Sequence, residues 1–165
     1  QELIFDELNM NHTGWHLDDF DPAILAMPYE YTNGQHEAVG HYGYPDYPDG
    51  QLRSSVSDMA RFVAAISNQG QLEQAAILSP ESTASMLAPP YPDVDSSQFV
   101  FWYQSTMAGR TVIGHGGSDQ GVATEIAFSP ESGIGVIFMI NTTWDVAGDA
   151  PGAIMEALFT HAETH

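Results

Sequence analysis

Apolar residues recur at helical spacing in the stretch between Ser54 and Gly70. The positions of this stripe are Met59, Phe62, Val63 and Ile66. They fall at i, i+3, i+4 and i+7, which is the period of one helix face. Serines and Asp58 stand at the start of the run and Gly70 follows it, as expected for the two ends of a helix. The pattern predicts a helix over residues 54–70.

Two later segments also have helical patterns. In residues 78–89, Ser79 can cap a helix, Pro80 suits its first turn and Pro89 ends it. Residues 149–162 read as a C-terminal helix with an apolar stripe that we expect to be buried. The members of this stripe are Ile154, Met155, Leu158 and Phe159.

The segment before residue 54 is less regular. Residues 1–10 have apolar positions at helical spacing but no capping residue before them, so they read like the middle of a helix. Residues 16–50 are rich in Pro, Gly, Tyr and Asp and show no sustained period. So long an irregular stretch usually has a function or packs against another region. Its tyrosines Tyr42, Tyr44 and Tyr47 therefore line a substrate cleft or pack against that region.

Strand patterns dominate the last third of the chain. The predicted strands cover residues 98–106, 110–115, 123–129 and 134–141, with a hairpin turn at 107–109. The last run is continuously apolar, which predicts a strand covered on both faces. Phe101 and Trp102 are expected in the core. Together the patterns predict an α+β fold, with an antiparallel β-sheet flanked by helices.

The charge balance excludes several partners. The chain has 22 acidic residues and three basic ones, Arg53, Arg61 and Arg110, and it contains no lysine. A surface with a formal charge of −19 repels nucleic acid and anionic membrane surfaces, so neither is expected as a partner. The absence of cysteine excludes disulfides and thiolate metal sites. No segment has the apolar length of a membrane-spanning helix.

Histidine pairs raise the question of a metal site. His12 and His16 are four residues apart, as are His161 and His165, and this spacing suits zinc on a helix face. A Thr-Gly pair interrupts the first set, and the second lies at the terminus. We expect no metal and no other cofactor.

The glycine-rich stretch VIGHGGSDQG, residues 112–121, is the strongest candidate for chemistry. A phosphate-binding P-loop needs a lysine, which is absent. In the dinucleotide-binding pattern G-x-G-x-x-G, Asp119 occupies the position of the third glycine. In the nucleophile-elbow pattern G-x-S-x-G, Gln120 occupies the position of the last glycine, and a strand follows where a helix is required. These three readings are excluded.

Three stretches in order resemble the C-terminal part of the serine β-lactamase and penicillin-binding-protein superfamily. They are IFDELNMNHTGW, PDGQLRSSVSDMARFVAAI and IGHGGSDQGVATEIAFSPESGIGVIFMIN. The similarity is greatest to the class C-like branch, with its esterases and D-peptidases. The resemblance implies a partial β-lactamase/transpeptidase-like fold across residues 1–165, with a helix end and irregular region to residue 53 and the helices and strands after it.

The resemblance also implies roles for the glycine-rich stretch. His115, Gly116 and Gly117 match the His-x-Gly form of the family's third motif, on a strand that forms one wall of the active site. His115 would orient the substrate or a catalytic tyrosine. The backbone N–H of Ser118 would be one oxyanion-hole donor. Gly116, Tyr44 and Tyr47 would contact a small-molecule or peptide substrate.

The rest of the family's machinery is not in this chain. The nucleophile motif Ser-x-x-Lys is absent because there is no lysine. Tyr31-Thr32-Asn33 has the residues of the family's second motif, Tyr-x-Asn. In the family, however, that motif precedes the stretch matched by residues 1–14, so this match comes too late along the chain. The missing residues are expected upstream, so the chain by itself is expected to be inactive and to associate with that part or with itself. Export to the periplasm or outside the cell is common in the family.

Two functions follow from the resemblance. The first is a serine hydrolase that cleaves an ester, amide or β-lactam carbonyl through an acyl-enzyme. The alternative is a binding or scaffold domain that has lost its nucleophile.

Overall fold

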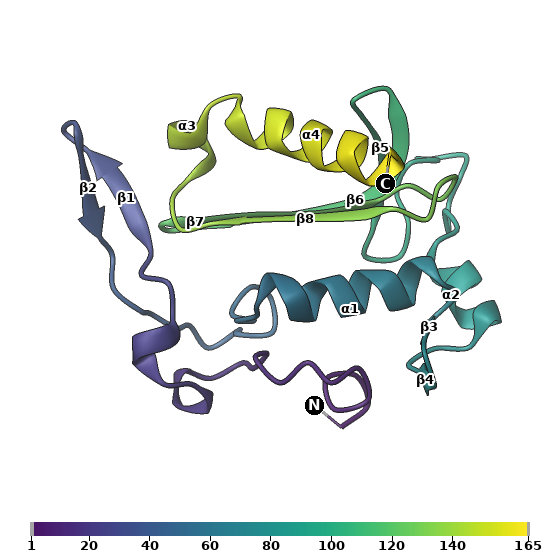
Figure 1. Ribbon diagram of the computed structural model, residues 1–165, viewed down its shortest axis with the longest axis horizontal. Helices are drawn as coiled ribbons and strands as arrows, with labels where there is room; N and C mark the ends of the chain where they lie inside the picture. Colours follow the sequence, from purple (N-terminus) through teal and green to yellow (C-terminus); the bar gives the residue numbers. More distant parts are fainter. Residues whose placement is uncertain (1, 165) are drawn as a thin grey trace.

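The computed structural model describes residues 2–164 of the protein. Its centre is a four-stranded antiparallel sheet in the order β5-β6-β7-β8. The strands are β5 Tyr103–Met107, β6 Arg110–Asp119, β7 Val122–Phe128 and β8 Gly135–Ile140. Helix α1 (Val56–Ser67) covers one face and helix α4 (Ala150–Thr164) covers the other (Figure 1). This arrangement confirms the α+β fold with an antiparallel sheet between helices.

Shorter elements surround these three layers. The two small helices are α2 Pro80–Met86 and α3 Trp144–Ala147, and the two short 3-10 helices are η1 Leu17–Asp19 and η2 Pro22–Ile24. The two small hairpins are β1 Tyr29–Thr32 with β2 Gln35–Ala38, and β3 Gln71–Leu72 with β4 Ala75–Ala76. The β1–β2 hairpin projects beyond one end of the main sheet (Figure 1).

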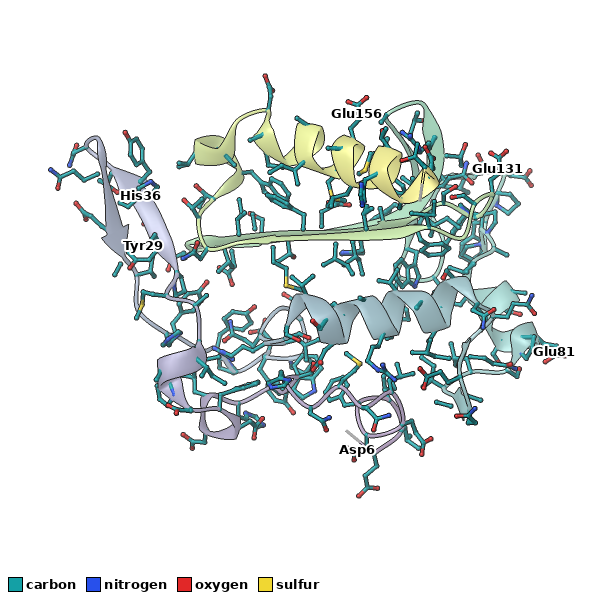
Figure 2. The ribbon with its side chains drawn as sticks, in the orientation of Figure 1. Asp6, Tyr29, His36, Glu81, Glu131 and Glu156 are labelled. Atoms are coloured by element: carbon teal, nitrogen blue, oxygen red, sulfur yellow. The ribbon has the colours of Figure 1, made fainter. Side chains whose placement is uncertain are left out.

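Alternating side chains of β6 enter the two cores on either side of the sheet. Val112 packs in the core against α4, with Met155 and Phe159. Ile113 packs in the core against α1, with Val63. This alternation follows from the period of two along a strand. The side chains between the layers are drawn in Figure 2.

Helix α1 begins as the sequence predicts. Ser55 is its N-cap, and the Ser55 side chain accepts a hydrogen bond from the backbone N–H of Asp58. Asp58 itself is buried, and its Oδ2 accepts from the His12 N–H at 2.7 Å and from the Thr13 hydroxyl at 2.8 Å. The carboxylate thus fastens the N-terminal segment to the start of α1.

The N-terminal segment is not the regular helix that the spacing predicts. Residues 2–9 form successive turns that end like a helix C-terminus. Asn9 is left-handed, with φ 53°, and the Met10 N–H donates to the Phe5 carbonyl at 2.7 Å. These are the features of a Schellman motif, which ends a helix.

The first predicted strand is shorter than the pattern implies. It covers Tyr103–Met107, because the chain turns sharply at Phe101, where φ is 67°. Trp102 is buried as expected, whereas Phe101 is 80% exposed, so its assignment to the core is wrong. The next strand, β6, extends four residues beyond the predicted end at residue 115.

The C-terminal helix has a narrower buried stripe than predicted. Met155 and Phe159 are buried, and Pro151 is buried one turn earlier. Ile154 and Leu158 are 44% and 41% exposed, so their predicted burial is wrong. A single row at i, i+4 and i+8 faces the sheet, because α4 meets it along one line of side chains.

Candidate active site

The outer edge of β6 is open over its second half. Strand β5 pairs with only the first half of β6. The pairing runs from the pair Met107 and Arg110 at the turn to the pair Tyr103 and Gly114. On its other side β6 pairs with β7 from the Ile113–Phe128 pair to the Asp119–Val122 pair at its end. Within residues 2–164, no strand pairs with the outer edge of residues 115–119. This edge contains the His115–Ser118 stretch singled out by the sequence.

The register shows which backbone groups face the open edge. A two-residue turn at Ala108 and Gly109, both with positive φ, makes Met107–Arg110 a hydrogen-bonded pair. Backbone groups alternate in direction along a strand, so the N–H and C=O groups of even-numbered β6 residues point toward β5. Beyond the end of β5, those of Gly116 and Ser118 therefore point outward.

His115 lies exposed on the α1 side of the sheet. Its Nδ1 is 2.6 Å from the Gly116 carbonyl oxygen. A hydrogen bond at this distance requires the proton on Nδ1, which leaves Nε2 as the acceptor of the neutral ring. The ring packs on Tyr103 with centroids 5.0 Å apart and an interplanar angle of 33°. The imidazole is thus held at the rim of the open edge by two contacts.

Side chains of β7 lie close to the adjacent glycines. A Cβ atom at Gly116 would lie 2.7 Å from Glu125 Oε2, and one at Gly117 would lie 2.6 Å from Thr124 Oγ1. Both glycines are opposite these residues in the register. Burial raises the pKa of the Glu125 carboxyl, and the nearby charge of His115 partly opposes this. The missing side chains leave room for Glu125 and Thr124 to lie across the strand.

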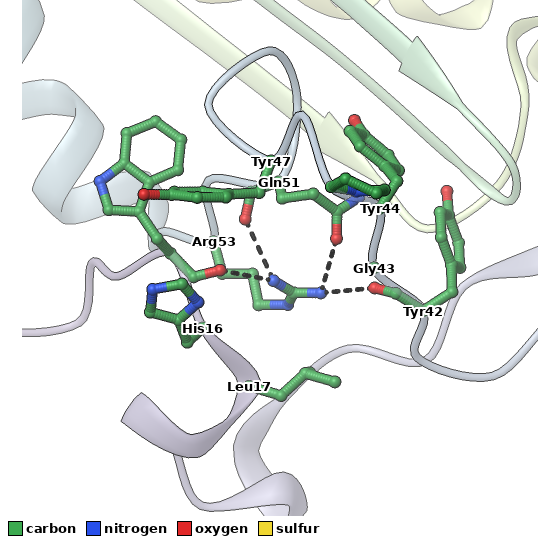
Figure 3. Close-up of a pocket in the computed structure, with 10 residues that line it drawn as sticks. His16, Leu17, Tyr42, Gly43, Tyr44, Tyr47, Gln51 and Arg53 are labelled. Carbon is green, nitrogen blue, oxygen red and sulfur yellow. Dashed lines mark hydrogen bonds between the residues drawn. The ribbon is translucent and has the colours of Figure 1, made fainter.

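An open cavity of about 370 Å³ lies near the end of β6. Tyr44 and Tyr47 are among the residues that line it, so the structure brings these two predicted substrate-binding residues together there. At its centre, the Arg53 guanidinium donates to the carbonyls of Trp15, Gln51 and Tyr42 and to the Gln51 Oε1 atom (Figure 3). Arg53 therefore joins the backbone at Trp15, Tyr42 and Gln51 into one wall.

Tyr42 connects this cavity to the site strand. Its carbonyl accepts from Arg53, and its hydroxyl donates to the Gln120 carbonyl at 3.0 Å, directly after β6. Burial and the neighbouring Asp119 carboxylate raise the pKa of Tyr42 to about 12. Tyr42, which lines the cavity, thus contacts the chain directly after β6.

The shifted pKa of Tyr42 predicts a loss of stability in alkali. Between pH 10 and 12 the unfolded chain releases the Tyr42 proton while the folded chain keeps it, so the free energy of unfolding falls as pH rises. Tyr42→Phe should make this fall less steep in urea unfolding series. Tyr91→Phe, at a tyrosine that is 73% exposed, should keep the parent slope. Equal slopes for all three proteins would contradict the prediction.

Sequence reasoning missed three residues of this region. Tyr103 was expected only as part of a strand, and Glu125 only as an alternating position. Arg53 had the clearest signal, since it is one of only three cations in a strongly acidic chain. Its partners are distant in sequence, so their identity is not visible there.

Two further observations concern metals and membranes. Within residues 2–164, no three histidine, aspartate or glutamate side chains gather in a way that could hold a metal ion. His165, part of one spacing considered above, lies outside the described residues. None of the helices in this range has both the length and the apolarity needed to cross a membrane.

The sequence profile of the Beta-lactamase family matches residues 1–159. The chain therefore belongs to the β-lactamase family, within the serine β-lactamase and penicillin-binding-protein superfamily. The resemblance seen in the sequence is confirmed.

Individual relatives agree with this assignment. The chain is 26% identical to the unguisins hydrolase ungD of Aspergillus violaceofuscus, over 87% of this chain and 30% of the relative. It is similar in structure to a penicillin-binding protein from Bacillus halodurans, with a TM-score of 0.70, 21% identity, and coverage of 95% of this chain and 48% of the other. A class C β-lactamase from Rhodobacter sphaeroides gives a TM-score of 0.70 at 17% identity, covering 98% and 53%.

The chain spans only part of these proteins. It covers about a third of the curated relative and about half of the two solved structures. The family is one of hydrolases. The matched residues 1–159 include β6, the strand with the open edge.

Proposed function

We propose that this chain forms one wall of the acyl-transfer site of a serine hydrolase. The observation that carries the proposal is the open edge of β6, where the N–H groups of Gly116 and Ser118 point outward. A substrate backbone can add to such an edge as an extra strand. The reaction is the cleavage of an ester, amide or β-lactam carbonyl through an acyl-enzyme.

In that reaction the residues of this chain bind and orient the substrate. The Ser118 N–H donates to the oxygen that becomes negative when the carbonyl is attacked, and Gly117 lets the substrate approach the strand. The Nε2 atom of His115 accepts a hydrogen bond from the substrate or from a catalytic hydroxyl and so orients that group. The attacking serine and its lysine come from outside this chain, which has no lysine. A hydrolase and a D-stereospecific amidohydrolase among the similar proteins support hydrolysis.

Replacing His115 with alanine in the full-length protein tests this role. We expect kcat/KM for a p-nitrophenyl ester to fall about 10- to 100-fold, because the reacting group loses its orienting partner. His36→Ala, at an exposed histidine on the β1–β2 hairpin, should keep the parent value. Equal activity of the two variants would contradict the role of His115.

The alternative is a domain that binds without turnover. A full-length protein that binds substrate analogues but releases no product from any ester, amide or β-lactam would favour it.

A further inference from the structure

The cavity beside β6 differs in charge from the rest of the molecule. The chain has 22 acidic residues, yet none of the 10 residues that line the cavity is acidic. The walls include the rings of Trp15, Tyr44 and Tyr47. Trp15 and Tyr47 pack edge to face, with centroids 5.9 Å apart. The cavity is therefore an aromatic site with a cation inside an otherwise negative surface.

That cation has no acidic partner. Arg61 pairs with Glu73 at 3.8 Å, and Arg110 pairs with Glu163 at 2.5 Å. In the described part of the chain, Arg53 has no carboxylate within ion-pair distance and binds only neutral oxygens. Its Nε–H makes no hydrogen bond there. The positive charge of Arg53 is thus available to an anion.

Gln51 supplies a second unused donor. The residue is only 7% exposed, so it is more than nine-tenths buried. Its Oε1 accepts from Arg53 at 3.2 Å, which fixes the amide and assigns the other terminal atom as Nε2. Within residues 2–164, Nε2 has no hydrogen-bond partner, although Gln51 lines the cavity. In the described residues Thr142 Oγ1 is the only fully buried side-chain nitrogen or oxygen atom without a partner, so Gln51 Nε2 is not fully enclosed and an acceptor in the cavity can reach it.

We propose that this cavity binds a carboxylate group attached to an aromatic or apolar body. The carboxylate accepts from Gln51 Nε2 and lies beside the Arg53 guanidinium, while the body packs on the rings. Charge-assisted hydrogen bonds of this kind are stronger than neutral ones.

The place of the cavity identifies the ligand as part of the substrate, an identification that rests on the proposed function. Tyr42 joins Arg53 to Gln120, which is two residues along the chain from Ser118, the residue whose N–H we assign to the reacting carbonyl. At the rise of an extended strand, this separation is roughly 7 Å. A substrate lying along β6 and continuing past Ser118 would therefore extend toward Tyr42 and the cavity.

Binding can be measured on the full-length protein without following any hydrolysis. The probe is N-acetylphenylalanine, and its primary amide is the uncharged comparison, both titrated by calorimetry. We expect the carboxylate to bind at least tenfold more tightly than the amide. Equal affinity, or no binding of either compound at millimolar concentration, would overturn the proposal.

The variant Gln51→Glu tests the named atoms. The new carboxylate keeps an oxygen for Arg53 but neutralises the charge of the guanidinium and removes the Nε2 donor, so carboxylate affinity should fall at least tenfold with the fold retained. Gln71→Glu adds the same charge at an exposed position in β3 and should bind as the parent does. Unchanged binding by Gln51→Glu, with an unchanged melting temperature, would overturn the proposal.

These results separate the two proposals. Carboxylate selectivity in a full-length protein that never forms an acyl-enzyme would sustain the ligand site and refute the hydrolase function. Ester hydrolysis without carboxylate selectivity would sustain the hydrolase function and refute the ligand site.

Discussion

Replacing Ser118 with proline should lower kcat/KM of the full-length protein about 10²- to 10³-fold. The change removes the backbone N–H that we assign to the oxyanion, and the loss of one such donor has effects of this size. The outward direction of this N–H means that no hydrogen bond to β7 is lost. Proline is tolerated where the N–H of an edge strand faces solvent. Steady-state hydrolysis of a p-nitrophenyl ester measures the effect.

Ser118→Ala is the matched control, because it removes the hydroxyl and keeps the N–H. We expect it to retain activity within a few-fold of the parent. Thermal unfolding should show both variants folded. Comparable activity in the proline and alanine variants would contradict the assignment of this donor.

Replacing Asp58 with alanine should lower the free energy of unfolding by about 3 kcal/mol. The buried carboxylate accepts from the His12 N–H and the Thr13 hydroxyl, and charged hydrogen bonds contribute about 1.5–3 kcal/mol each. Its loss leaves these donors without their partner, and removal of such a network is a known cause of large destabilisation. Urea unfolding of the chain measures the change.

Two further variants refine this prediction. Asp58→Asn keeps one oxygen acceptor without the charge. It should therefore lower the free energy of unfolding by less than Asp58→Ala does. Asp18→Ala removes an exposed carboxylate and should change the free energy of unfolding by less than about 0.5 kcal/mol. A change below about 1 kcal/mol for Asp58→Ala would show that the N-terminal segment is held by other contacts.

Local patterns predicted the elements whose ends are set by nearby residues. The Ser55 cap and the apolar stripe place α1 correctly, and the turn at Ala108 and Gly109 places the β5–β6 hairpin. The β1–β2 hairpin was missed within a segment read as irregular. Its signal was the Asn33-Gly34 pair, whose two positive φ values form the two-residue turn.

The error at Phe101 has a direct bearing on the site. A strand over residues 98–106 would have paired with β6 as far as Asp119 and closed its outer edge. The left-handed turn at Phe101 takes the chain out of the sheet, while Trp102 remains anchored in the core. Pattern reasoning could not foresee this, because a run of aromatic residues has the same period with or without the turn.

The candidate site was predicted only in part. The resemblance singled out His115–Ser118, and these residues do lie on one strand, but their roles in catalysis stay predictions. The joint position of Tyr44 and Tyr47 around Arg53 depends on contacts between residues far apart in sequence. Such contacts are set by the fold and produce no periodic pattern in the sequence.

Mass spectrometry of the acylated protein tests the central claim most directly. The full-length protein would be incubated with an activated ester, stopped early, and digested to locate the acyl group. The account predicts an adduct on a serine outside residues 1–165, formed roughly 100-fold more slowly in the Ser118→Pro variant. No adduct, or an adduct on a side chain within this chain, would contradict the claim that β6 is the wall of a serine acyl-transfer site.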